Sequence, residues 1–569
     1  MDAGKRTIND IFNGNRVLEI PFFQRAYVWD TDQWERLLED MEHVSQTNKP
    51  YFLGSVILKQ QPTNTGNRVG DKRTLIDGQQ RLTTLSIFFK VLALKTKDDY
   101  EFNRMFKLRD LIAIQHNHND IDAYELIMNL SELKDLSGTD NITRAYTYFN
   151  QNLNLDKLDI NNILAKILFV GIDLDENEDE QQIFDTINSL GVKLTTAELL
   201  KNYFFNRDEI STYNTYWKNV FEKDEDTKNY WDREITAGRL KREFIDLFFF
   251  SYLQIKIQDK NLNVKTEDKI EFSKVEQLFE SYKRFIKEYL NNDKKSILAE
   301  IKDYALIFQE NFDYEIIEVE LSDISGIERI NAIIFGLDTS TLIPYILYVL
   351  KNVSNNNERN ELFEFIETYV MRRMVVHAST KNYNQLFTDR LINNEILSKQ
   401  QFVGYLDGQS DKVNFLPTNE ELKAGFDTAQ LVNKQSAGIL YFIESKIRNR
   451  RLQSTQLLGL NKYSLEHLMP KKWENNWGKL SNNEDRIKRN RKLLTLGNLT
   501  IITQALNSTI RDAHWTVKRK GKKDKKGLNN YSAGLETMND YLLFDEWNEQ
   551  TIEQRAKFLY NNAKEIWKI

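Results

Sequence analysis

Residues that interrupt helices are scarce in this chain. It has only 6 prolines and 22 glycines in 569 residues, and both residue types cost free energy inside a helix. An all-β fold with many tight turns would need more of them. We therefore predict a mainly α-helical protein with small α/β parts. Because a domain usually holds roughly 100–200 residues, the length predicts about three domains or more.

The composition suits a globular protein in a reducing compartment. Hydrophobic residues make up 41% and charged residues 28% of the chain, which suits a folded, water-exposed protein. There is no cysteine, so disulfides and thiolate metal sites are excluded. The N-terminal sequence lacks the apolar segment of a secretion signal, and apolar stretches such as 339–350 are too short to cross a bilayer. We expect a cytoplasmic protein with no membrane segment.

The residue pattern changes twice along the chain. Residues 1–205 predict a mixed α/β domain, 206–440 a long helical region, and 441–569 short strands and turns among helices. Near the first boundary, residues 181–190 predict a helix, and residues 195–198 have the form of a capping box that begins the next one. We predict three domains with these boundaries.

A strand, a glycine turn and a helix follow one another in the N-terminal region. Residues 51–58 predict a strand, 73–76 its hairpin partner, and 81–95 a helix. Asp77 and Gly78 separate the second strand from the helix. Backbone N–H groups at a helix start favour an anion, and glycine lets the anion approach closely. The sequence therefore predicts an anion site at this turn.

The side chains around this turn suit a nucleotide. Arg81 can clamp a phosphate with two parallel hydrogen bonds, and Gln79 and Gln80 can bond a phosphate or a base. Asp77 can orient Arg81, or hold a metal or a ribose. The simpler alternative is a strand, turn and helix stabilised by an Asp–Arg pair, and the sequence leaves both interpretations open.

The C-terminal region holds the residue types that phosphodiester hydrolysis needs. Residues 463–503 predict two strands; the first ends with Glu466 and His467, and Asn498 lies near the start of the second. Asn507 follows on a helix. A neutral imidazole is a suitable base near pH 7, and a carboxylate with an amide oxygen can hold a Mg²⁺ ion that keeps most of its waters. The alternative is an ordinary buried histidine with asparagines that cap turns.

A basic run follows these residues. Residues 511–526 hold eight Lys or Arg and only two Asp. The whole chain has a net charge of −6, so any attraction to DNA phosphates must be local. A solvated loop is the alternative for such a run. The residues that we expect to contact the DNA backbone are Lys518, Arg519, Lys520, Lys522 and Lys523.

The order Glu-His-x-x-Pro, Gly-Asn-Leu-Thr and Asn resembles the HNH, or His-Me finger, nuclease motif. It is most similar to the C-terminal domain of GmrSD-type restriction endonucleases, and Arg555 and Trp567 also fit the closing helix of that family. The resemblance implies a ββα-metal nuclease embedded in helices that uses Mg²⁺ or Mn²⁺. It implies that Glu466 and Asn507 are metal ligands, His467 is the general base, and Asn498 stabilises the ββα loop.

The N-terminal region resembles the ParB-like domain of the same family. A Gln-Arg pair follows residues 20–21, a strand comes later, and the motif Asp-Gly-Gln-Gln-Arg (DGQQR) occupies 77–81. The segment 184–202 also matches, except that Leu190 stands where the family commonly has arginine. The resemblance implies binding and hydrolysis of a nucleoside triphosphate (GTP, ATP or CTP). The implied nucleotide-binding residues are Gln24, Arg25, Asp77, Gly78, Gln79, Gln80 and Arg81.

Together, the motifs and the resemblance imply an NTP-regulated, metal-dependent endonuclease that nicks or cuts modified or foreign DNA in anti-phage defence. Its partners would be DNA, a nucleoside triphosphate and, for double-strand cutting, a second copy of the chain. Two alternatives stay open. One is a nuclease that attacks RNA or host DNA in abortive infection. The other is a nucleotide-gated DNA clamp without nuclease activity.

Overall fold

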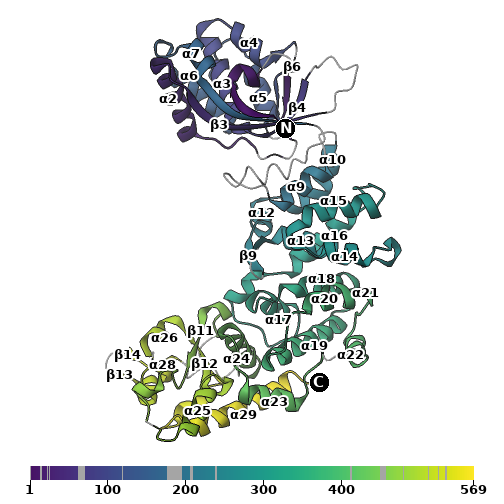
Figure 1. Cartoon of the computed structure of the whole chain (residues 1–569), viewed down its shortest axis with the longest axis vertical. Helices are drawn as coiled ribbons and strands as arrows, with labels where there is room; N and C mark the ends of the chain where they lie inside the picture. Colours follow the sequence, from purple (N-terminus) through teal and green to yellow (C-terminus); the bar gives the residue numbers. More distant parts are fainter. Residues whose placement is uncertain are drawn as a thin grey trace. The chain divides into compact units, whose positions relative to one another are not determined.

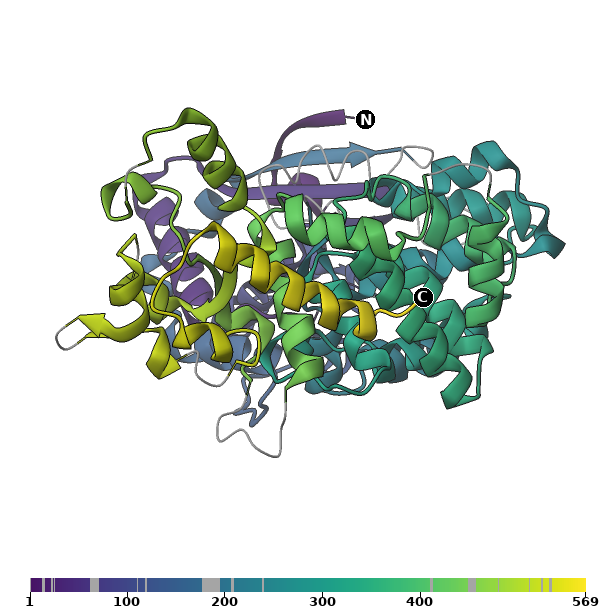
Figure 2. The same cartoon turned by 90° about the horizontal axis from the view of Figure 1, so that it is seen from below.

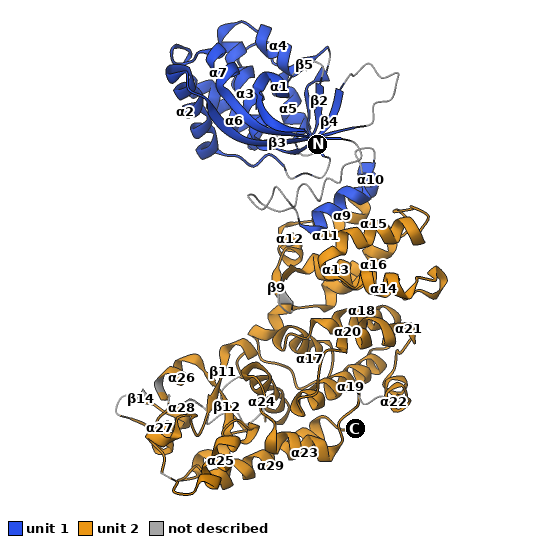
Figure 3. Ribbon diagram, viewed as in Figure 1, with its two compact units in different colours: residues 1–213 blue, residues 214–569 orange. Residues whose placement is uncertain are grey.

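The chain folds into two compact units in the computed structural model, residues 1–213 and residues 214–569 (Figure 3). Helices dominate its secondary structure, which confirms the predicted mainly α-helical class with small α/β parts. None of the helices that the structure describes combines the length and the apolar character of a membrane span. The described residues are 2–12, 16–21, 24, 26–61, 71–109, 111–117, 120–175, 195–205, 209–237, 240–409, 413–448, 457–478, 480–510, 512–522, 525–531 and 535–569.

Unit 1, whose strands β3 and β4 are labelled in Figure 1, is built on a mixed six-stranded sheet with the strand order β1-β8-β3-β4-β2-β7. β3 and β4 are antiparallel, which confirms the predicted hairpin, whereas β3 is parallel to β8 and β2 is parallel to β4. The strands are β1 (Asp2–Thr7), β2 (Arg16–Glu19), β3 (Tyr51–Gln60), β4 (Asp71–Asp77), β7 (Ile114–Gln115) and β8 (Ile167–Leu174). A separate short pair is formed by β5 (Lys107–Leu108) and β6 (Leu111–Ile112).

The central helix of unit 1 is α3 (Gln79–Thr96). Its residues 82–93 are all buried, as in a helix that is enclosed by a core on every side. It packs against α4, α5 and α6 and confirms the helix predicted at 81–95. The other helices are α1 (Ile8–Ile11), α2 (Thr31–Thr47), α4 (Tyr100–Phe106), α5 (Ile121–Met128), α6 (Asn141–Asn152), η1 (Leu155–Lys157), α7 (Ile160–Lys166), α9 (Thr196–Phe204) and α10 (Ile210–Tyr213).

Helix α9 begins with the predicted capping box. The Thr195 hydroxyl accepts a hydrogen bond from the Glu198 backbone N–H at 3.2 Å, and the Glu198 carboxylate accepts one from the Thr195 N–H at 2.9 Å. These bonds satisfy two N–H groups that a helix start otherwise leaves without partners. The helix predicted at 181–190, together with Leu190, lies outside the described residues.

The first part of unit 2 is a run of helices with one short hairpin. The hairpin consists of β9 (Glu234–Ala237) and β10 (Leu240–Glu243). The helices are η4 (Asn214–Lys218), α11 (Asn219–Phe221), α12 (Glu225–Trp231), α13 (Phe244–Lys256), η5 (Lys260–Leu262), α14 (Thr266–Phe272), η6 (Val275–Gln277), α15 (Leu278–Tyr289), α16 (Leu298–Asn311), η7 (Tyr314–Glu318), α17 (Ile327–Asn331), η8 (Ala332–Gly336), η9 (Ser340–Leu342), α18 (Ile343–Asn352), α19 (Asn356–Val375), α20 (Tyr383–Gln385), η10 (Leu386–Arg390), α21 (Leu391–Asn393), α22 (Lys399–Asp407), α23 (Asn419–Thr428) and α24 (Asn433–Ile447).

The remainder of unit 2 is a small antiparallel hairpin among helices, and α24 packs on both strands of it. The boundary predicted at 440 falls inside α24. The elements are η11 (Leu460–Lys462), β11 (Tyr463–His467), η12 (Trp473–Asn475), α25 (Asn483–Lys492), η13 (Leu496–Asn498), β12 (Leu499–Thr503), α26 (Gln504–Ile510), α27 (Trp515–Lys520), β13 (Gly521–Lys522), β14 (Lys525–Lys526), α28 (Leu528–Tyr531), η14 (Asn539–Leu543) and α29 (Glu549–Ile566).

Helix α29 ties the end of the chain to the rest of unit 2 (yellow in Figure 2). It packs against α23, α24 and η13. The Trp567 side chain that follows it is fully buried, and its indole N–H donates to the Glu367 carboxylate at 3.2 Å. The Arg372 guanidinium donates to the Trp567 carbonyl at 2.6 Å. Two buried charged side chains of α19 therefore hold the end of α29 in place.

Candidate functional site

The hairpin of β11 and β12 positions Glu466 and His467. Glu466 lies opposite Thr500 and His467 opposite Leu499. The first residue after β11, Leu468, donates its N–H to the Asn498 carbonyl at 2.9 Å and so continues the pairing. The predicted end of the first strand at Glu466 and His467 is confirmed, and both side chains are fixed by a paired backbone.

Asn498 fastens the loop that joins this site to the second strand. Its side chain is fully buried. The amide oxygen accepts from the Met469 N–H at 2.8 Å and from the Trp547 indole at 2.9 Å. The amide nitrogen donates to the carbonyls of Met469 and Leu493 at 2.8 and 2.9 Å. All four hydrogen-bonding positions of the amide are used, and three of these bonds hold the backbone of the loop.

Arg555 supports the same loop from α29. Its side chain is fully buried, and its Nη1 atom donates to the carbonyls of Leu496, Gly497 and Leu499 at 3.3, 3.0 and 2.6 Å. Its Nε atom donates to the Thr537 carbonyl at 3.0 Å. One buried guanidinium therefore satisfies the backbone on both sides of Asn498, and burial lowers its pKa to about 10.

His467 is a neutral imidazole that solvent can still reach. Its side chain is only partly buried. Burial, together with the positive charges of Lys471 and Lys518, lowers its pKa to about 4. The ring is therefore unprotonated near pH 7, which is the form that accepts a proton.

Glu466 is buried and already pairs with a cation. The Lys518 ammonium donates to the Glu466 carboxylate and also, at 2.7 Å, to the His467 carbonyl. Burial raises the pKa of the Glu466 carboxyl, and the Lys518 charge opposes that rise. The fold therefore places a positive charge, the Lys518 ammonium, next to the Glu466 carboxylate.

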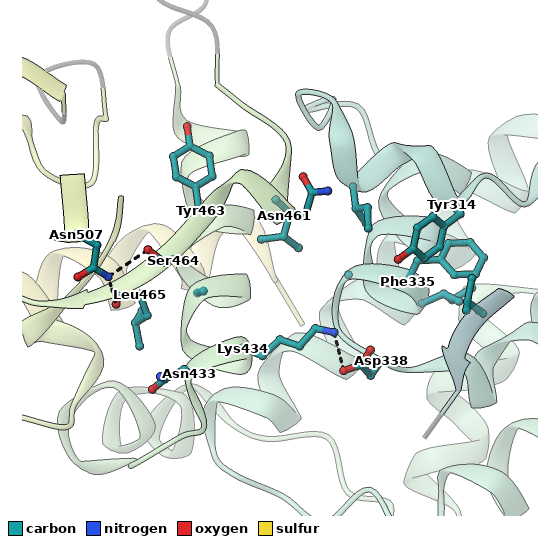
Figure 4. Close-up of a pocket in the computed structure, with 16 residues that line it drawn as sticks. Tyr314, Phe335, Asp338, Asn433, Lys434, Asn461, Tyr463, Ser464, Leu465 and Asn507 are labelled. Carbon is teal, nitrogen blue, oxygen red and sulfur yellow. Dashed lines mark hydrogen bonds and ion pairs between the residues drawn. The ribbon is translucent and has the colours of Figure 1, made fainter. Parts of the chain in front are cut away.

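Asn507 lies on α26, as predicted, beside the same strand. Its amide nitrogen donates to the Ser464 hydroxyl at 3.1 Å and to the Leu465 carbonyl at 3.3 Å (Figure 4). Alternate side chains of a strand leave the same face, so Ser464 and Glu466 share one. The two bonds of the nitrogen fix the orientation of the amide, whose oxygen can act as an acceptor.

A pocket of about 610 Å³ borders Asn507 (Figure 4). Tyr314 and Phe335 line it opposite the hairpin, and an ion pair between Lys434 and Asp338, 2.6 Å apart, lies in its wall. The pocket therefore combines an aromatic wall, a polar wall and direct access to Asn507.

The donor set can be tested against a divalent metal. Among the residues that the structure describes, no cluster of three or more His, Cys, Asp or Glu side chains could hold a metal. Mg²⁺ does not need such a cluster, because it keeps several waters and is often held by one or two oxygen ligands. The Glu466 carboxylate and the Asn507 amide oxygen are oxygen donors of the type that such a hard cation prefers.

The basic run does not lie as expected. Lys518 is fully buried against Glu466, and the nearly buried Arg519 donates to the Leu542 and Phe544 carbonyls and to Asp545. The expectation that Lys518 and Arg519 contact DNA is therefore corrected, since neither side chain reaches the surface. Lys520 and Lys522 are exposed, and Lys523 lies outside the described residues.

The N-terminal candidates gather where β4 ends and α3 begins. Gly78 has φ of +102° at the start of α3, and a Cβ there would lie 2.9 Å from the Val56 side chain. Arg81 donates to the Ser55 carbonyl at 2.8 Å and to the Asp77 carboxylate at 3.2 Å. The Ser55 hydroxyl donates to the same carboxylate at 2.6 Å. Asp77 and Arg81 therefore form the expected ion pair, and Ser55 hydrogen-bonds both of them.

Gly54 makes room for Arg81. It has φ of +128°, and a Cβ at this position would lie 2.9 Å from the Arg81 Nη1 atom. A side chain at 54 would therefore strain the backbone and push the guanidinium away. A glycine inside a strand often marks such a close approach of another group. Gly54 followed by Ser55 in β3 was therefore the sequence signal that could have identified these two residues as part of the site.

The glutamines of the motif do different things. The Gln80 oxygen accepts from the Val28 and Trp29 N–H groups at 2.9 and 3.3 Å, and its nitrogen donates to the Ala26 carbonyl at 3.3 Å. Gln80 thus holds the segment 26–29 through both the oxygen and the nitrogen of its amide. Gln79 is buried.

The segment that carries Gln24 is held from further along the chain. The Gln24 nitrogen donates to the Ile76 carbonyl at 3.3 Å, next to the Asp77 turn. Asn117 donates to the Gln24 carbonyl at 2.6 Å, and the Asp120 carboxylate accepts the Tyr27 N–H at 2.8 Å. Gln24 therefore joins the cluster around Asp77, whereas Arg25 lies outside the described residues.

Comparison with known families agrees with this arrangement. Residues 8–205 match the model of the GmrSD restriction endonuclease N-terminal domain, and residues 416–561 match that of the GmrSD restriction endonuclease C-terminal domain. No curated protein matches the chain. Both matched domains are those of restriction endonucleases. The chain therefore belongs to the class of DNA endonucleases that act in phage defence. More particularly, it belongs to the GmrSD-type restriction endonucleases.

Proposed function

We propose that unit 2 hydrolyses DNA phosphodiester bonds by HNH-type, metal-dependent chemistry, and that nucleotide binding and hydrolysis by unit 1 regulate this activity. The observation that carries the proposal is the neutral, partly exposed His467 at the end of β11, directly beside the buried Glu466. A base without a proton at neutral pH and an adjacent carboxylate at a fixed strand end are what hydrolysis of a phosphodiester needs.

His467 would act as the general base. It takes a proton from a water molecule, and the resulting hydroxide attacks the phosphorus as the bond to the leaving oxygen breaks. A Mg²⁺ or Mn²⁺ ion held by Glu466 and Asn507 would supply neutralisation of the charge that develops on the phosphate. Asn498 and Arg555 take no part in proton transfer, but they keep the loop after His467 in one conformation.

A plasmid-nicking assay tests this proposal. The wild type and His467→Ala are compared with Mg²⁺ or Mn²⁺, with EDTA, and with each nucleoside triphosphate, on unmodified and modified DNA. The proposal is supported if the wild type nicks the plasmid in a metal-dependent manner and His467→Ala does not. Parallel reactions with RNA and single-stranded DNA address the RNA-directed alternative. Binding of DNA without cleavage of any substrate would favour the nucleotide-gated clamp.

Arg81→Ala is expected to weaken binding of the nucleoside triphosphate by about 10–100-fold, because a charged, two-point phosphate contact is lost. Calorimetric titration with ATP, GTP and CTP measures this. The matched control is Arg73→Ala, which removes an arginine that pairs with Asp71 and Asp173 in the same sheet. If Arg81→Ala lowers the melting temperature but leaves all three affinities unchanged, the Asp77–Arg81 pair is only structural.

We propose that two exposed lysines of the basic run, Lys520 and Lys522, contact the DNA backbone. The double variant Lys520→Glu, Lys522→Glu should weaken DNA binding and lower the slope of log Kd against log salt by about 2, roughly one for each lost phosphate contact. Fluorescence anisotropy in a salt series measures the slope. Lys399→Glu with Lys423→Glu, two exposed lysines on α22 and α23, controls for the change in net charge. Equal slopes in both double variants would contradict the assignment.

A further inference from the structure

Lys518 is a buried lysine for which the hydrolytic steps above have no use. No part of its side chain is exposed. Its ammonium donates to the Glu466 carboxylate and to the carbonyl of the next residue, His467, at 2.7 Å. It therefore contacts the two residues proposed as metal ligand and general base, although it lies about 50 residues further along the chain.

The position of this ammonium is set by the fold and not by a flexible loop. Lys518 lies on α27, which begins at the fully buried Trp515. The Trp515 indole donates to the Phe544 carbonyl at 2.9 Å, and its ring lies 4.9 Å from that of Trp547. Trp547 in turn donates to Asn498. The helix that carries the lysine is thus connected to the loop of the candidate site.

The cost of burying the Lys518 ammonium explains why its contact with Glu466 matters. An ammonium loses its hydration when it is buried, and only a well-placed partner offsets that loss. Glu466 is the carboxylate that provides the offset. A divalent cation would need the same carboxylate, and two cations a few ångströms apart in a buried site repel each other strongly. The Lys518 ammonium and a metal ion therefore cannot both interact strongly with the Glu466 carboxylate.

We propose that Lys518 is a positioning residue that holds Glu466 in the metal-free protein and competes with a divalent metal ion for its carboxylate. The inference rests on the proposed metal site. Binding of Mg²⁺ or Mn²⁺ moves the ammonium away from Glu466, and the His467 carbonyl remains as its acceptor. The lysine thereby sets the metal concentration at which the site fills.

The test is titration of the full-length protein with MnCl₂, followed by calorimetry and by the melting temperature. Lys518→Met keeps the length of the side chain and removes its charge, so it should bind Mn²⁺ at least about tenfold more tightly than the wild type. Lys520→Met, an exposed lysine on the same helix, should bind Mn²⁺ like the wild type. Lys518→Arg keeps the positive charge and should not gain affinity.

Glu466→Gln separates the inference from the proposed function. It should abolish the high-affinity Mn²⁺ site. If it does so while Lys518→Met binds Mn²⁺ no more tightly than the wild type, competition by Lys518 is wrong and the metal site stands. If Mn²⁺ binding is unchanged in Glu466→Gln, Glu466 is not a ligand and both assignments fall.

A loss of stability in Lys518→Met does not prevent the test. Its unpaired Glu466 should then make Mn²⁺ raise the melting temperature more than in the wild type. The double variant Glu466→Gln, Lys518→Met should regain stability without that response to metal. A Lys518→Met protein that Mn²⁺ stabilises no more than it stabilises the wild type would overturn the proposal.

Discussion

Replacement of His467 by alanine is expected to slow DNA cleavage by about 10²–10⁴-fold, the range that loss of a general base produces. The side chain is only partly buried, so the fold should persist. Single-turnover nicking rates at saturating metal measure the effect, with melting temperatures recorded for both proteins. His43→Ala, which changes an exposed histidine on α2, is the control. Equal rates for wild type and His467→Ala would remove His467 from the mechanism.

The same residue sets an expected pH dependence. Its pKa of about 4 means that the imidazole is unprotonated from about pH 5 upward. The cleavage rate should therefore lose its acid limb near pH 6.5 and fall only as pH decreases through about 4. In the unfolded chain this histidine has the ordinary pKa near 6.5. Between about pH 6.5 and pH 4 it is therefore protonated in the unfolded state but not in the folded state. The stability contributed by the neutral ring is present above pH 6.5 and is lost progressively toward pH 4.

Asn498→Ala is expected to destabilise unit 2 by about 3–5 kcal/mol, because it removes four buried hydrogen bonds and leaves their backbone and indole partners unsatisfied. Denaturant unfolding followed by tryptophan fluorescence measures the loss of stability. The control is Asn482→Ala, which removes an exposed N-cap from α25 and should cost only about 1 kcal/mol. A similar small loss for both variants would mean that the loop is held by other contacts, with Arg555 the first to examine.

Local patterns accounted for most of the elements that carry the site. The hairpin of β3 and β4, the buried helix after Gly78 and the capping box at Thr195 depend on residues close together in sequence, and all were predicted. The strand that ends at Glu466 and His467 was predicted for the same reason. The alternation of apolar residues, a glycine or a capping-box pair fixes the local conformation in these cases.

Long-range burial was not predictable in this way. Lys518 lies in a run of basic residues that looks solvated, and only the tertiary fold brings its ammonium to Glu466. Gln80 is similar: the motif places it beside Arg81, but its amide is used by the backbone of 26–29. Polar residues of this kind reveal their roles through partners that sequence spacing does not show.

The anchoring of α29 has a consequence for how the protein is made. On the ribosome, Glu466, His467 and Asn498 emerge before Trp547, Arg555 and Trp567, and chains begin to fold from the N-terminal side. The loop around Asn498 has no indole partner until Trp547 appears, and its carbonyls have no guanidinium until Arg555 follows. A chain released early would carry the proposed catalytic residues on an unfinished loop. We therefore expect the loop around Asn498 to reach its folded conformation only after translation has passed Trp547 and Arg555.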